Sequence, residues 1–200
     1  MNKSLFIFIF LSILSLSSGQ YSPTPVRDTD KNVLRVGTNY YIVPAVPGGG
    51  GGLITARGPG QLCPLEVAQQ IGDKLNGSPL SFSPANPNKD GIIFESTDIN
   101  IKFMDKSCAP STVWRVDDPN YFGERYISTQ GMLGRPGRET INNWFKIQKY
   151  EDHYKLVHCP SVCKTCKIVC EDIGIKISER GRRSLVLNKK PPFKVMFKKA

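Results

Sequence analysis

Short segments in which apolar and polar residues alternate recur along the chain, and they predict β-strands. Residues 99–103 read INIKF, with an apolar side chain at every second position. This alternation places the apolar side chains on one face of a strand. The predicted strands are 39–43, 91–94, 99–103, 111–116, 144–148, 154–158, 173–177, 184–187 and 193–197.

Turn-forming residues separate these segments and favour an all-β chain. Residues 46–52 read VPGGGGG and residues 83–91 read SPANPNKDG. Such Gly-, Pro- and Asn-rich stretches are typical of turns between strands. One helix is predicted, over 65–75, and it ends at Asn76-Gly77. The pattern indicates a sandwich or a barrel without choosing between them, and the similar segments 79–82 and 192–195 hint at a threefold repeat.

The N-terminus predicts a secretory signal peptide. Lys3 precedes the apolar run 5–16, and the small residues 17–19 follow it. This is the order of a charged region, an apolar region and a cleavage site. A membrane anchor is the alternative, but the run is shorter than the ~20 residues that span a bilayer. We therefore expect residues 1–19 to be removed and residues 20–200 to form one domain that is secreted to the cell exterior, with a vacuole as the alternative destination.

The six cysteines have two interpretations. In the oxidising secretory route they predict up to three disulfides, for which fifteen pairings exist. The four cysteines at 159, 163, 166 and 170 also have the close spacing of zinc ligands. Secretion favours the disulfides, so neither a metal nor any other cofactor is expected.

Composition and charge narrow the possible functions. The 200 residues include 27 Lys and Arg against 17 Asp and Glu, a net charge of +10. That charge permits acidic partners. Secretion argues against nucleic acid and favours a solvated basic face or weak attraction to acidic cell-wall polymers. His153 and His158 are the two histidines, and no phosphate loop or nucleophile motif accompanies them. We therefore do not expect an enzyme.

Residues 26–44 (VRDTDKNVLRVGTNYYIVP) carry a specific resemblance. They resemble the N-terminal signature of the plant Kunitz-type (soybean trypsin inhibitor) family, and the six cysteines resemble those of its miraculin-like branch. Further matching segments are 50–53, 63–65, 96–103, 144–147, 154–160, 172–175, 182–187 and 192–197. The resemblance covers nearly all of residues 20–200.

This resemblance implies a disulfide-bonded β-trefoil of twelve strands, in which a six-stranded barrel is closed at one end by hairpins. It also implies one pairing of the cysteines. The implied disulfides are Cys63–Cys108, Cys159–Cys170 and Cys163–Cys166.

The family resemblance further implies a protease inhibitor whose exposed loop enters the protease already extended. It assigns Pro87, Asn88, Lys89 and Asp90 to that reactive loop, with Lys89 entering the specificity pocket of a trypsin-like protease. Two departures weaken inhibition: Asp90 is acidic where inhibitors carry an apolar residue, and Val36 replaces an Asn that braces the loop. The alternative is an ordinary solvated turn.

The expected partner is therefore a protease, bound by a monomer that does not associate with a membrane once the signal peptide is removed. Inhibition of a cysteine or aspartic protease through another surface is an alternative. A non-inhibitory trefoil that binds carbohydrate or another protein is a further one, with Trp114 and Trp144 as its possible sugar-stacking residues. Asn76-Gly77-Ser78 is a possible N-glycosylation site, although Pro79 follows it directly.

Overall fold

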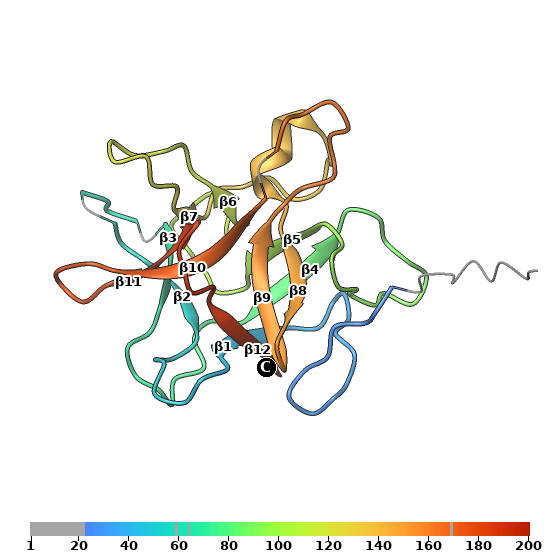
Figure 1. Cartoon of the computed structure of the whole chain (residues 1–200), viewed down its shortest axis with the longest axis horizontal. Coiled ribbons are helices and arrows are strands. Elements are labelled where there is room, and N and C mark those ends of the chain that lie inside the picture. The colour runs from blue at the N-terminus through green and yellow to red at the C-terminus, as the bar shows by residue number, and fades with distance from the viewer. Residues whose placement is uncertain (1–22, 59, 64, 169) are drawn as a thin grey trace, which may run out of the picture.

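The computed structural model describes residues 23–58, 60–63, 65–168 and 170–200, and these form an all-β chain (Figure 1). The strands are β1 (Tyr40–Pro44), β2 (Leu53–Ala56), β3 (Glu66–Gln69), β4 (Leu80–Pro84), β5 (Ile99–Phe103), β6 (Arg115–Val116), β7 (Ile127–Ser128), β8 (Lys146–Tyr150), β9 (His153–His158), β10 (Glu171–Ile177), β11 (Arg183–Leu187) and β12 (Lys194–Lys199). Within the described residues the one helix is the short 3₁₀ helix η1 (Arg138–Asn143). The predicted signal peptide lies outside this part of the chain.

Six of the twelve strands form a barrel. They pair in the order β5-β4-β1-β12-β9-β8 along the sheet. The Ile99–Phe145 bridge, with both backbone hydrogen bonds at 2.9 Å, then joins the start of β5 to the residue before β8. Because the first and last strands are joined, the barrel has no free edge.

Three hairpins close one end of this barrel. They are β2–β3, β6–β7 and β10–β11, and β3 pairs with both β7 and β11. The chain therefore repeats one unit three times: a barrel strand, a cap hairpin and a second barrel strand. This is the predicted β-trefoil, and β4 and β12 stand at equivalent places in the first and third units, as segments 79–82 and 192–195 suggested.

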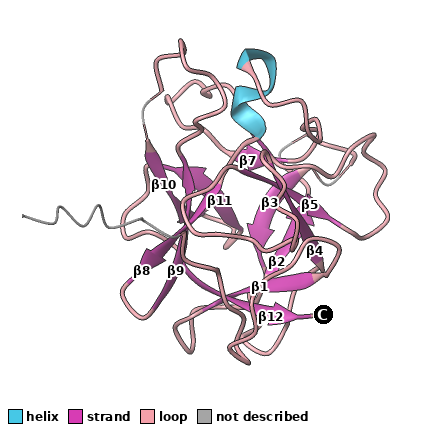
Figure 2. Cartoon of the chain, turned by 90° about the vertical axis from the view of Figure 1, so that its right-hand side faces the viewer, coloured by secondary structure: helices cyan, strands magenta, loops and turns pink. Residues whose placement is uncertain are grey.

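A continuous apolar core fills the barrel and the space beneath the cap. Figure 2 shows the strands that surround it in magenta. The largest members of the core are aromatic. Trp114 lies between Phe103 and Phe145, with ring centroids 5.7 and 6.0 Å away, while Phe82 and Phe197 meet edge to face at 5.6 Å. Rings buried in these geometries contribute more than their area alone.

The predicted helix at 65–75 is wrong. Residues 66–69 form β3, and all four are buried. Backbone pairing with β2 on one side and with β7 and β11 on the other decides the conformation of this segment, because a central strand satisfies its hydrogen bonds through its neighbours. Segment 91–94 is also not a named strand, since only isolated bridges connect it to the N-terminal segment, at Arg35–Ile92 and Pro25–Phe94.

Candidate functional site

The β4–β5 connection (residues 85–98) holds the predicted loop. It joins two barrel strands at the end away from the cap, because each cap hairpin connects the other ends of the barrel strands. Figure 1 shows this connection in green on the right, with the connections of β6–β7 and β10–β11 on the left. The loop therefore projects from an end of the barrel that no cap hairpin covers.

The tip of this connection is a closed turn. The Gly91 amide donates to the Asn88 carbonyl at 3.2 Å, which leaves Lys89 and Asp90 as the two central residues. Gly91 has a φ of +63°, a conformation that glycine adopts without strain. Lys89 and Asp90 are both exposed. The expectation of an extended loop is therefore wrong at Lys89 and Asp90: the tip is folded because the Asn88 carbonyl and the left-handed glycine close it.

Two side chains hold this turn in place. The Asn88 amide donates to the Ile92 carbonyl at 2.6 Å, and its oxygen accepts from the Ile92 amide at 3.0 Å. The Arg35 guanidinium reaches across from the N-terminal segment and donates to the Asp90 carbonyl at 2.7 Å. The Val36 amide adds a backbone hydrogen bond to the Gly91 carbonyl at 2.8 Å.

The sequence had predicted an unbraced loop, because Val36 lacks a polar side chain. The Val36 side chain is indeed 44% exposed and makes no hydrogen bond, but Arg35 and Asn88 hold the loop instead. The signal for Asn88 was present in the sequence, since Asn commonly bonds the backbone of its own turn. The Arg35 contact joins residues 55 positions apart, and no local pattern indicates it.

Lys89 has no ion-pair partner among the described residues, whose salt bridges all lie elsewhere. An exposed cation of this kind is available to a carboxylate on a partner. What the tip offers is a projecting lysine on a turn whose backbone is already ordered.

The structure contains three disulfides, in the pairing that the resemblance implies. Cys63–Cys108 joins the β2–β3 connection to the β5–β6 connection. Cys159–Cys170 and Cys163–Cys166 both lie in the β9–β10 connection. Cys63–Cys108 closes a chain segment that contains the whole β4–β5 connection, but Arg35 and Asn88 make the direct contacts to its tip.

The remaining predicted residues lie apart from this tip. Asn76 is exposed in the β3–β4 connection. Trp114 and Trp144 are fully buried, so neither is available to stack on a sugar. Among the described residues no cluster has the composition of a metal site, and no helix there has the length and hydropathy to cross a membrane.

His158 is a buried core residue. Its side chain is 2% exposed, packs edge to face on Phe145, and places Nε2 3.3 Å from the Ile141 carbonyl. Burial lowers its pKa from 6.5 to about 4, and the nearby Arg125 charge adds to this effect. A neutral imidazole enclosed in this way does not reach a substrate.

Comparison with known proteins places these features in one family. The model of the Kunitz legume family, described as trypsin and protease inhibitor, matches residues 26–199. Miraculin of Synsepalum dulcificum is 44% identical over 88% of this chain and 84% of its own length. Kunitz trypsin inhibitor 5 of Arabidopsis thaliana is 38% identical over the full length of both chains. The solved Kunitz-type cysteine protease inhibitor PCPI-3 from potato is 35% identical and superimposes with a TM-score of 0.77, over 90% of this chain and 98% of that one.

Proposed function

Because the chain belongs to the Kunitz family of plant trypsin and protease inhibitors, we propose that it inhibits a trypsin-like serine protease through the β4–β5 tip. Lys89 would enter the specificity pocket, where an acidic group pairs with a cation. The observation that carries this proposal is an exposed, unpaired lysine at the centre of a turn that Arg35 and Asn88 hold from both sides.

A turn that is ordered before binding lowers the cost of association. Each side chain that is immobilised only on binding costs about 0.5–1.5 kcal/mol, and a loop that must be ordered adds to this cost. The hydrogen bonds of the Asn88–Gly91 turn already fix its backbone. The specificity pocket would then receive the projecting Lys89 side chain from a turn whose backbone is already ordered.

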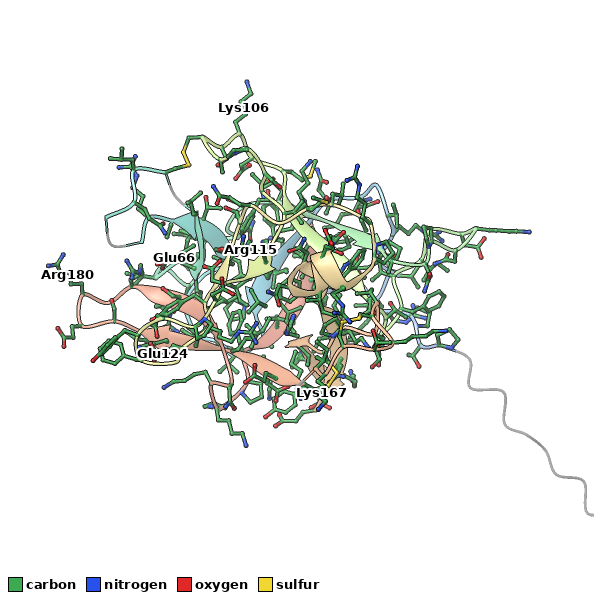
Figure 3. The ribbon with its side chains drawn as sticks, turned by 90° about the horizontal axis from the view of Figure 1, so that it is seen from above. Glu66, Lys106, Arg115, Glu124, Lys167 and Arg180 are labelled. Atoms are coloured by element: carbon green, nitrogen blue, oxygen red, sulfur yellow. A yellow bond between two sulfur atoms is a disulfide. The ribbon has the colours of Figure 1, made fainter. Side chains whose placement is uncertain are left out.

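Replacing Lys89 tests the proposal. Lys89→Ala should weaken trypsin inhibition at least about a hundredfold, because the carboxylate of the pocket is left buried without a cation. Lys106→Ala is the matched control: Lys106 is also exposed, and it points away from the molecule at the top of Figure 3. Equal inhibition by the native protein and both variants would refute the assignment of Lys89.

The closed turn and Asp90 also favour a second candidate. An acidic residue beside Lys89 opposes entry into many serine protease clefts, and a folded tip does not imitate a substrate. The chain would then act on a cysteine or aspartic protease through another surface, or bind a non-protease partner as a non-inhibitory member. Assays against papain and pepsin, each with native protein and with Lys89→Ala, separate these candidates, since activity that survives the substitution lies elsewhere.

Secretion is part of the proposal. We infer that residues 1–19 direct the chain into the secretory route and that residues 20–200 form the mature, monomeric inhibitor, without catalytic activity and with a role in plant defence. The three disulfides support export, because they form and persist in oxidising compartments. N-terminal sequencing of protein secreted by plant cells should begin at Gln20, and the mass of the same sample reports any glycan on Asn76.

A further inference from the structure

The β6–β7 connection repeats the turn of the β4–β5 connection. Asn120-Tyr121-Phe122-Gly123 matches Asn88-Lys89-Asp90-Gly91 in its first and last residues. The Gly123 amide donates to the Asn120 carbonyl at 2.9 Å, and Gly123 has a φ of +76°. Both turns thus place two central residues between an asparagine and a left-handed glycine.

The β6–β7 turn is also braced by hydrogen bonds from its own asparagine. The Asn120 side-chain oxygen accepts from the Phe122 amide at 3.0 Å and from the Glu124 amide at 2.9 Å. The backbone amide of Asn120 donates to the Glu124 carbonyl at 2.9 Å. The Glu124 carboxylate in turn accepts from Lys176 at 2.5 Å, which ties this hairpin to β10. The backbone of the tip is therefore ordered by contacts within the chain.

The two central residues of this turn are aromatic and lie in solvent. Tyr121 is 96% exposed and Phe122 is 80% exposed, and the rings meet edge to face at 5.4 Å. Large aromatic side chains are usually at least partly buried, and exposed apolar groups gathered at one place mark interaction sites. Neither ring contributes to the core, so the fold does not account for their presence at the tip.

We propose that the β6–β7 tip is a second protease-binding site, which fits a chymotrypsin-like protease. Tyr121 occupies the position that Lys89 has in the first turn, and an apolar specificity pocket accepts an aromatic side chain as an acidic one accepts lysine. Phe122 takes the place of Asp90, so the second tip has an apolar residue where the first has a carboxylate. The inference rests on the proposed function in two respects: the partner is a protease, and the side chain at this position of the turn enters its specificity pocket.

The two tips are placed so that both can be occupied together. In Figure 1 the β6–β7 connection lies at the upper left and the β4–β5 connection at the right. Figure 3 shows the same separation: Glu124, at the base of the second turn, lies on the left, and the green β4–β5 connection extends to the right. The barrel stands between them, so a protease at one tip leaves the other tip free.

Inhibition measurements with chymotrypsin and trypsin test the second site. Tyr121→Ala with Phe122→Ala should raise the inhibition constant for chymotrypsin at least about tenfold and leave that for trypsin within about twofold. Tyr121→Phe keeps the ring and should lose much less chymotrypsin inhibition than the alanine variant. Leu62→Ala is the control, because Leu62 is 92% exposed in the connection of the neighbouring cap hairpin β2–β3. Circular dichroism and thermal melting establish that each variant is folded.

A binding experiment separates this proposal from the proposed function. Trypsin and chymotrypsin whose catalytic serine is replaced by alanine should elute with the native protein as a 1:1:1 complex. Lys89→Ala should remove trypsin alone, and the Tyr121/Phe122 variant should remove chymotrypsin alone. Displacement of one protease by the other, loss of chymotrypsin in Lys89→Ala, an equal effect of Leu62→Ala, or no chymotrypsin binding to folded native protein would overturn the second site.

Discussion

The core and the β4–β5 tip are held together by different forces. In the core, Phe145 and Trp114 are buried and meet edge to face. At the tip, Lys89 is exposed, and the turn keeps its shape through hydrogen bonds from Arg35 and Asn88. Burial of apolar surface is non-directional and large, whereas a hydrogen bond is directional and contributes about 0.5–1.5 kcal/mol.

On the proposed function, stability therefore depends on the core and recognition on the tip. Substitutions in the core should change the free energy of unfolding with little effect on the geometry of the tip. Substitutions at the tip should change binding with little effect on stability.

Phe145→Ala should lower the free energy of unfolding by about 5 kcal/mol, the upper end of the range for such truncations. The large value is expected because two backbone hydrogen bonds join Phe145 to Ile99 across the barrel seam. They hold the backbone in place, so the cavity left by the ring cannot collapse. Urea unfolding measures the change, and Phe122→Ala, which truncates an exposed ring, should stay within about 0.5 kcal/mol. A large change in trypsin inhibition by folded Phe145→Ala would break the separation of the two regions.

Removal of Cys63–Cys108 should cost about 4 kcal/mol, since it closes 45 residues, whereas removal of Cys163–Cys166 should cost about 2 kcal/mol for a separation of 3. The paired Cys→Ala variants are compared by urea unfolding. The first disulfide also encloses the β4–β5 connection. Of the two disulfides, it is therefore the one whose loss is more expected to alter trypsin inhibition as well as stability. Equal costs for the two disulfides would contradict the entropic argument.

Acid should destabilise the core through His158. Its pKa is about 4 in the folded protein and near 6.5 when the chain is unfolded, so between these values the unfolded state binds more protons. The free energy of unfolding should therefore fall by about 3 kcal/mol from pH 7 to pH 4.

The histidine variants isolate that contribution. His158→Gln should reduce the pH dependence of urea unfolding, whereas His153→Gln should not. Burial raises the pKa of Asp98 and Asp117, which opposes the histidine effect as pH falls, but these carboxylates are common to all the proteins compared. If the two histidine variants follow the same pH curve as the native protein, His158 does not couple folding to protonation.

The smallest effect is expected at the tip itself. Val36→Asn combined with Asp90→Ile should tighten trypsin binding about tenfold, or about 1.4 kcal/mol. The Asn side chain can add a hydrogen bond to the loop, since the Val36 Cβ is 3.8 Å from where a Cβ on Gly91 would lie. The Asp90 change removes a carboxylate from the protease cleft.

Val36→Ala is the control for that gain, because it alters the same position without adding a donor. Inhibition constants for trypsin measure the effect, and urea unfolding should show all these variants within about 0.5 kcal/mol of the native protein. A double variant no tighter than Val36→Ala would show that neither an added donor at position 36 nor loss of the Asp90 carboxylate improves trypsin binding.

Much of the architecture follows from local sequence patterns. Segment 99–103 alternates apolar and polar residues and forms β5, and segment 173–177 lies within β10. The resemblance of residues 26–44 to Kunitz inhibitors then identified the trefoil and the disulfide pairing. Local pattern was insufficient at 65–75, where it predicted a helix and the structure has the central strand β3. Pairing with strands that are distant in the sequence outweighs the intrinsic preference of this segment.

The sequence by itself determined the composition of the tips: a lysine beside an aspartate in one Asn-x-x-Gly turn, and two aromatic residues in the other. Only the tertiary structure decided how those residues are presented. The Arg35 contact to Asp90 and the Lys176 contact to Glu124 join residues 55 and 52 positions apart. Such contacts depend on how the barrel and its cap fold together, and for that reason the shape of a binding loop is less readable from sequence than the strands that carry it.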